Sequence, residues 1–244
     1  MRQEMNQRQR DVFELIVKNY VETAEPVGSR FVSRKLGLSS ATIRNVMSDL
    51  EEMGLVTHPH TSAGRIPTDK GYRYYIDSLM RVRSVNESVL RSIREEYHET
   101  MRSIEDVLMH TSHIISNLTN YVGLTLTSQN DRLYLDGTSH IITQPEFQDL
   151  KKLYYIIRFL EQKRQILNLL HNDLASEDLR IHIGKENQHS YLSECSIVTK
   201  GYKSKGKVAG RVGVIGPKRM LYEKVIPTVE VLADTMTGIL DNLD

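Results

Sequence analysis

The sequence predicts an α+β fold. Apolar residues recur at helical spacing through three short segments that end before residue 55, and two short strand-like segments follow them. Beyond residue 120, strand-like runs alternate with longer helical stretches. At 244 residues the chain has room for more than one domain, so we expect an N-terminal domain over 1–83, a long helix over 84–119 and an α+β domain over 120–244.

A first helix is predicted over about 7–23, since Asn6 and Gln9 have the spacing of a capping box. The proline and glycine of AEPVGS interrupt that helix. Ser29 is then a suitable N-cap for a short second helix, and Gly37 suits the left-handed position that ends it.

The third helix follows LSS and ends at Gly54. Its apolar positions are Ile43, Val46, Met47, Leu50 and Met53. LVTHPH and RIPT are candidate strands separated by the turn TSAG, and Thr68 can cap a fourth helix. Three short helices followed by a two-stranded ribbon predict a winged helix-turn-helix, whose third helix enters the major groove of DNA.

The rest of the chain is predicted to mix helices and strands. Ser84 and Glu87 have capping-box spacing and open the long helix, which carries an apolar seam. YVGLTLT, RLYLDGT, LRIHIG, ECSIVTKGY and KVAGRVGVIG read as strands. A helical stretch starts near Thr143, and a closing helix covers 218–241. The basic stretch TKGYKSKGKVAGR, at 199–211, is expected to be a solvated hairpin loop.

The face of the third helix opposite its apolar positions carries residues suited to DNA. They are Ser40, Thr42, Arg44, Asn45 and Ser48. Arg44 can donate two hydrogen bonds to guanine and Asn45 can form two with adenine, and each such pair contributes roughly 1–3 kcal/mol of discrimination. From spacing alone, a helical domain that never binds DNA is an equally good interpretation, because exposed Arg and Asn side chains are usually just solvated.

The ribbon and its flanks offer further contacts. Small residues and one arginine at the wing predict a tight tip, with Arg65 projecting toward a phosphate or into a minor groove. The wing contacts expected are His60, Thr61, Ser62, Gly64 and Arg65. The phosphate contacts expected are Ser29 and Arg30, at the start of the second helix, together with Lys70 and Arg73.

Composition excludes several classes of protein. No run of about 18 apolar residues could span a bilayer, and the polar N-terminus does not read as a signal peptide. The single Cys195 excludes an internal disulfide and a thiolate zinc cluster, which favours the cytoplasm. The net charge of +1 gives no whole-chain argument for nucleic acid. No coherent set of catalytic residues is present, so we expect no enzyme activity, cofactor or metal site.

Several long strings resemble one protein family. TAEPVGSR, SSATIRNVMSDLEEMGLV and HPHTSAGRIPTDKGYRYYID resemble the DNA-binding domain of HrcA, the bacterial heat-inducible transcription repressors. LYLDGTSHIITQPEF at 133–147 and the segment 213–240 resemble the family's C-terminal part. The resemblance implies a homodimer that binds an inverted-repeat operator on double-stranded DNA, represses class I heat-shock (chaperone) operons, is released on heat stress and depends on the GroE chaperonin.

One departure from the family affects the expected C-terminal domain. In the family, a domain-sized stretch that includes a dimerisation insert separates the segments like YVGLTLT and LYLDGT, whereas here only SQNDR at 128–132 intervenes. We therefore expect a truncated GAF-like α+β domain. The helix over 84–119 could replace the dimer contact as a coiled coil, or pack on its own domain. A ligand-sensing regulator of other genes and a degenerate, inactive homologue remain the alternatives.

Overall fold

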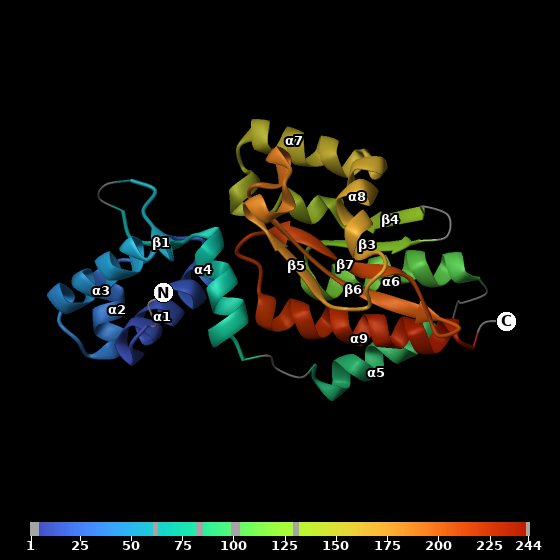
Figure 1. Cartoon of the computed structure of the whole chain (residues 1–244), viewed down its shortest axis with the longest axis horizontal. Helices are drawn as coiled ribbons and strands as arrows, with labels where there is room; N and C mark the ends of the chain where they lie inside the picture. The colour runs from blue at the N-terminus through green and yellow to red at the C-terminus, as the bar shows by residue number, and fades with distance from the viewer. Residues whose placement is uncertain (1–4, 61–62, 82–84, 99–102, 129–131, 243–244) are drawn as a thin grey trace. The chain divides into compact units, whose positions relative to one another are not determined.

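The computed structural model describes residues 5–60, 63–81, 85–98, 103–128 and 132–242 (Figure 1). The chain divides into two compact units, with the boundary between Arg81 and Val82. Among the helices of the described ranges, none has both the length and the apolar character needed to cross a bilayer.

The N-terminal unit is a winged helix-turn-helix, as predicted. Its elements are α1 (Gln7–Thr23), α2 (Ser29–Leu36), α3 (Ser40–Glu52), β1 (Val56–Thr57), β2 (Ile66–Pro67), α4 (Asp69–Tyr74) and a π-helical turn (Tyr75–Leu79). The capping box of Asn6 and Gln9 forms at the start of α1, and Gly37 takes the left-handed conformation after α2. Thr68 accepts a hydrogen bond from the Gly71 amide and so begins α4.

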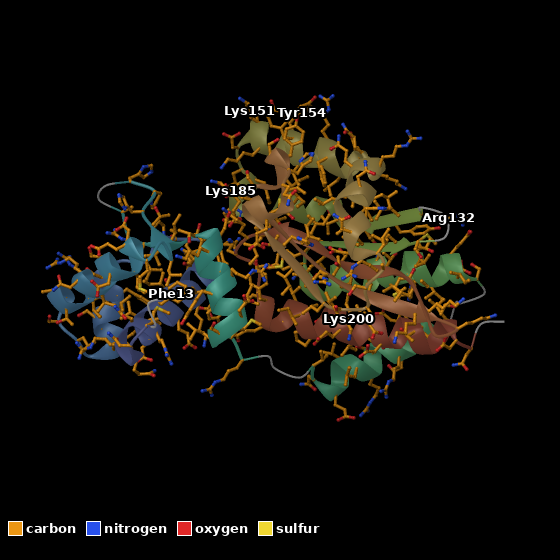
Figure 2. All side chains as sticks on the ribbon, in the orientation of Figure 1. Phe13, Arg132, Lys151, Tyr154, Lys185 and Lys200 are labelled. Atoms are coloured by element: carbon orange, nitrogen blue, oxygen red, sulfur yellow. The ribbon has the colours of Figure 1, made fainter. Side chains whose placement is uncertain are left out.

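The core of this unit lies between α1, α3 and the ribbon. Its buried side chains include Val12, Phe13, Ile16, Val17, Val32, Ile43, Val46, Met47, Leu50, Leu55, Val56, Tyr72 and Tyr75. Phe13 lies at the centre of the unit in Figure 2, and its ring meets that of Tyr74 edge to face at 6.1 Å. The helical spacing that predicted each helix therefore also identifies the residues it buries.

The single helix predicted over 84–119 is wrong. The structure has two helices, α5 (Glu87–His98) and α6 (Ile104–Thr119), and Ser103 is extended and caps the second. Tyr97 Oη and Thr111 Oγ1 lie 2.5 Å apart, whereas a continuous helix would separate residues 14 positions apart by about 21 Å. The chain therefore folds back on itself between α5 and α6.

The strands of the C-terminal unit form one antiparallel sheet. They are β3 (Val122–Thr127), β4 (Arg132–Asp136), β5 (Arg180–Ile183), β6 (Cys195–Ser204) and β7 (Lys207–Pro217), in the order β4-β3-β7-β6-β5. β3 pairs directly with β4, with Thr127 opposite Arg132. The stretch 199–211, expected to be a solvated loop, instead runs mostly within β6 and β7, because both strands continue almost to the turn at Lys205 and Gly206.

Helices cover both faces of this sheet (Figure 1). On one face, α7 (Leu150–Glu161) and α8 (Lys163–Leu170) cover apolar side chains of β3, β6 and β7. On the other face lie α6 and α9 (Tyr222–Leu240): Thr125 of β3 donates to the Leu108 carbonyl of α6, and Tyr222 of α9 lies 2.7 Å from Ser196 of β6. The alternation of β3 between these two faces is the period-2 pattern of a strand buried on both sides.

The helical stretch predicted from Thr143 begins later and is interrupted. Residues Pro145–Phe147 form a 3-10 turn, and α7 starts at Leu150 because Asp149 accepts hydrogen bonds from the amides of Lys151 and Lys152. Gln162 leaves the helical conformation, with φ −91° and ψ 72°, and separates α7 from α8. Asp149 is thus the N-cap of α7, six residues after the start expected from the sequence.

A buried arginine fastens the sheet to the segment before β5. Arg211 of β7 is fully buried. Its guanidinium donates to the carbonyls of Asp173, Ser176, Asp178 and Thr199 at 2.7–3.0 Å and to the Thr199 hydroxyl at 3.0 Å. Burial lowers the pKa of Arg211 to about 10, so the group stays protonated at neutral pH.

Candidate nucleic-acid interface

The outward face of α3 presents a compact set of DNA-type side chains. Ser39 begins the helix by accepting a hydrogen bond from the Thr42 amide at 3.0 Å, and the apolar positions are buried against the rest of the unit. Arg44, Asn45 and Ser48 are exposed, and none of them makes a side-chain hydrogen bond or ion pair with a described residue. Their spacing places them on one side of the helix, available to an outside partner.

Two of the predicted α3 residues are less exposed than Arg44 and Asn45. Ser40 and Thr42 are half-buried, and the Thr42 hydroxyl lies 2.9 Å from that of Ser39, so it belongs to the cap. Ala41, which the sequence reading missed, is exposed and precedes Arg44 by three residues. That spacing was the available signal, and a small apolar side chain there suits contact with a thymine methyl group.

The acidic residues of α3 gather in its second half. Asp49 accepts a hydrogen bond from Gln9 at 3.2 Å, and Glu51 contacts the ribbon. Glu52 is exposed. Because carboxylates repel phosphate, the basic first half of the exposed face is the part suited to enter a groove.

The base of the wing is held from two sides. Val56 pairs with Pro67 and Thr57 with Ile66, while Arg65 exchanges two 2.9 Å backbone hydrogen bonds with Val27. Arg65 therefore lies at the base of the ribbon, where its side chain is only 23% exposed and lies 2.7 Å from Glu51. The prediction that Arg65 projects from the tip is wrong, because its backbone forms a β-bridge with Val27 just before β2. Whether Arg65 contacts DNA stays a prediction.

The tip itself is only partly described. His58, Pro59 and His60 are exposed, and the His60 carbonyl accepts a hydrogen bond from the Ala63 amide. Thr61 and Ser62, both predicted wing contacts, lie outside the described residues. Among the described members of the predicted wing set, His60 is the exposed side chain at this end of the ribbon.

One glutamate links α3 to both limbs of the wing. Glu51 Oε1 lies 2.5 Å from His58 Nδ1, and Glu51 Oε2 lies 2.7 Å from the Arg65 guanidinium. These contacts fix the ribbon against the helix that carries Arg44. Glu51 is therefore a positioning residue for the interface, and no spacing within the sequence indicates it.

Glu51→Gln is expected to weaken DNA binding by about 1 kcal/mol, roughly fivefold, because a half-buried ion pair that holds the wing is lost. Fluorescence anisotropy with a labelled operator duplex measures the effect. Glu52→Gln removes the same charge from an exposed neighbour and is the matched control. Equal changes in the two variants would show that only the net charge near the DNA matters.

Gly64 has a structural reason to be glycine. A Cβ atom there would lie 2.4 Å from the Val27 carbonyl carbon and 2.5 Å from its oxygen. Gly64 was among the contacts expected at the wing tip, but this backbone approach places it beside the α1–α2 connection. Its lack of a side chain lets the ribbon pair with Val27.

Gly64→Ala is expected to lower the free energy of unfolding of the N-terminal unit by about 1–3 kcal/mol, because backbone atoms must move to admit the methyl group. Thermal unfolding followed by circular dichroism measures this. Gly28→Ala is the control, since nothing lies within 4 Å of a Cβ atom there. A Gly64→Ala chain as stable as Gly28→Ala would contradict the close approach.

The remaining predicted phosphate contacts differ in how available they are. Arg30 is exposed at the start of α2, and Ser29 beside it is half-buried. Lys70 donates to the Met53 carbonyl at 2.7 Å and so caps the end of α3, while Arg73 lies 3.5 Å from Asp77. Arg30 thus has the position of a phosphate contact, whereas the ammonium group of Lys70 is already hydrogen-bonded to the end of α3.

Two family models match the chain. Residues 4–78 match the model described as "Winged helix-turn-helix transcription repressor, HrcA DNA-binding", and residues 83–226 match "HrcA protein C terminal domain". The boundary between the two matches lies close to the boundary between the two compact units.

Curated relatives named heat-inducible transcription repressor HrcA match nearly the whole chain. The relative from Brevibacillus brevis is 30% identical over 336 aligned positions, covering 97% of this chain and 98% of the relative. Those from Moorella thermoacetica and Geobacter sulfurreducens are 30% identical, covering 98% of this chain and 99% of each relative. Since 336 positions exceed the chain's 244 residues by 92, at least 92 aligned positions lie opposite gaps in this chain.

One solved structure has the same fold. It is the crystal structure of a hypothetical protein at 2.2 Å resolution, with a TM-score of 0.77 and 19% identity, covering 99% of this chain and 100% of that one. At that level of identity the likeness establishes the fold alone.

Proposed function

The chain belongs to the HrcA family of heat-inducible transcription repressors, and from that premise we propose that it represses heat-shock chaperone operons by binding an inverted-repeat operator as a dimer. It is a regulator of transcription and not an enzyme. The observation that carries the proposal is the exposed face of α3, where Ala41, Arg44, Asn45 and Ser48 have no partner among the described residues.

In this proposal α3 lies in the major groove. Arg44 donates hydrogen bonds from its two terminal nitrogens to guanine O6 and N7, and Asn45 forms two hydrogen bonds with adenine N6 and N7. Ala41 contacts a thymine methyl group, and Ser48 contacts the backbone. Arg30 and the exposed start of α2 take a neighbouring phosphate, which fixes the depth of α3 in the groove.

An inverted repeat requires two copies of this surface. Two recognition helices about 34 Å apart, or a multiple of that distance, would read successive half-sites on one side of the duplex. A dimer bound there blocks polymerase by occupying the same DNA. The proposal places the protein in the cytoplasm, where bacterial operators and the chaperonin are found.

Release on heating requires only a modest loss of stability, because folded domains hold roughly 5–15 kcal/mol. The family's link to the GroE chaperonin, which helps keep the repressor in its binding form, is part of the proposal. At least 92 aligned positions of the relative have no counterpart in this chain, and we place this gap between β3 and β4. The shortened C-terminal unit is the observation that supports a marginal stability.

Operator binding before and after brief heating tests this function. We expect binding to fall after heating and to return when chaperonin and ATP are added during cooling. Anisotropy with an inverted-repeat duplex and a scrambled duplex measures both specificity and recovery. Equal binding in heated, unheated and chaperonin-treated samples would contradict the heat-release part, and equal binding to the two duplexes would contradict the repressor function itself.

A further inference from the structure

Helix α7 has an apolar face that nothing in the described C-terminal unit covers. Its inner side, with Ile156, Phe159 and Leu160, is buried in the core beside the sheet. On its outer side, Leu150 is 81% exposed and Tyr154 is 55% exposed. Figure 2 shows the side chains of Lys151 and Tyr154 at the outer surface of α7, pointing away from the sheet.

Exposed and half-buried residues form a stripe along the outer side of the helix. Leu150, Tyr154, Ile157 and Glu161 are spaced four, three and four residues apart, which places them on one side of an α-helix within about 60° of one another. Leu153 and Arg158 complete a shallow groove along this side. We call these six residues the α7 stripe. Apolar residues dominate its centre, whereas the solvated face of a helix carries mostly polar and charged residues.

Tyr154 is already fixed in place. The Arg158 guanidinium donates to the Tyr154 hydroxyl at 3.0 Å and lies 6.0 Å from the centre of its ring. An aromatic side chain that is ordered before binding loses little conformational entropy on association, and tyrosine and arginine are enriched among residues that dominate interface energies.

The charges at the two ends of the stripe favour a second copy in antiparallel orientation. Lys151 lies at the start of α7 and Glu161 at its end, and neither makes a side-chain ion pair with a described residue. A two-fold axis between Tyr154 and Ile157 places Tyr154 of each copy against Ile157 of the other. The same axis brings Lys151 of each copy beside Glu161 of the other. In a parallel pair of helices, by contrast, like charges would lie side by side.

We propose that the α7 stripe is the surface through which two copies of this chain associate. The proposal rests on the dimer of the proposed function and names its contact. The other candidate, the seam of the segment 84–119, is unavailable, because Ile93, Tyr97, Leu108 and Ile115 are buried within the C-terminal unit.

The interface is small, which sets its expected strength. A pair of three-turn helices buries less than the roughly 1,200–2,000 Å² of a standard stable interface. The dimer is therefore weak when free in solution, and two half-sites on one duplex hold the copies together by raising their effective concentration. Weak association of this kind also makes operator release sensitive to small losses of folded protein.

Sedimentation equilibrium of the full chain tests the surface. Tyr154→Glu is expected to raise the dimer dissociation constant at least tenfold, by placing two like charges at the centre of the contact. Met109→Glu is the matched control, because Met109 is 57% exposed but lies on α6, on the opposite face of the sheet. A wild-type dimer that Tyr154→Glu and Met109→Glu leave equally intact would overturn the α7 stripe and leave the dimer of the proposed function standing.

A charge exchange tests the antiparallel orientation. Lys151→Glu and Glu161→Lys are each expected to weaken the dimer, and the double variant is expected to restore it; a double variant as weak as either single one would overturn the pairing. A wild-type chain that is monomeric at every concentration would overturn both the surface and the dimer. Binding of that same preparation to a single half-site then shows whether the DNA-reading part of the proposed function fails with them.

Discussion

Arg211→Met is expected to lower the free energy of unfolding of the C-terminal unit by about 3–5 kcal/mol. Methionine fills much of the volume but donates nothing, so the carbonyls of Asp173, Ser176 and Asp178 lose their guanidinium donors. Each buried acceptor left without a partner costs about 1–3 kcal/mol. The segment before β5 is expected to detach from the sheet first.

Urea unfolding followed by circular dichroism measures this loss, with the transition of the C-terminal unit fitted separately from that of the winged helix. Arg180→Met is the control, because Arg180 belongs to the same region but is 46% exposed and makes only long contacts, at 3.4–4.0 Å, with Asp173, Asp178 and the Ser176 hydroxyl. An exposed pair of this kind contributes about 0–1 kcal/mol. If the two variants lose equal stability, the buried hydrogen bonds of Arg211 do not carry the effect.

Removing both base-reading side chains, as Arg44→Ala with Asn45→Ala, is expected to cost about 2–6 kcal/mol of operator discrimination. Both side chains are exposed and lack partners among the described residues, so neither change should affect folding. The variant is expected to bind specific and scrambled duplexes with similar affinity. Anisotropy titrations against both duplexes give the ratio directly.

Arg30→Ala separates base reading from phosphate contact. Since Arg30 is exposed at the start of α2, its loss is expected to weaken binding to all duplexes evenly and to reduce the slope of log affinity against log salt by about one. The assignment would be contradicted if Arg30→Ala abolished the sequence preference and the Arg44 and Asn45 variant kept it. Arg30 would then be the base-reading residue.

Local signals account for what could be predicted in the N-terminal unit. The capping box at Asn6, the left-handed Gly37 and the cap at Thr68 each act over a few residues, so their effect is visible in the sequence. The exposed positions Arg44 and Asn45 followed from the same helical period that identified the buried ones. Whether these two residues contact DNA stays a prediction.

Contacts between distant residues account for what could not be predicted. No proline or glycine in the sequence between α5 and α6 predicts that the chain reverses direction there. The reversal is accompanied by the contact between Tyr97 and Thr111, which are 14 residues apart. Arg65 looked like a projecting side chain because its partners, Val27 and Glu51, lie on other elements. In the sequence, Arg211 belongs to a stretch that reads as a basic hairpin. Its buried position was not predictable, because the carbonyls that accept its hydrogen bonds belong to a segment more than 30 residues earlier.

A footprint of the purified chain on the DNA upstream of its own gene tests the central claim, that α3 reads an inverted-repeat operator, most directly. The wild-type chain is expected to protect two symmetric half-sites whose centres are one helical turn or a multiple apart. The Arg44→Ala and Asn45→Ala variant is expected to leave the same DNA unprotected at equal concentration. Protection without symmetry, or an unchanged footprint with the variant, would contradict the account.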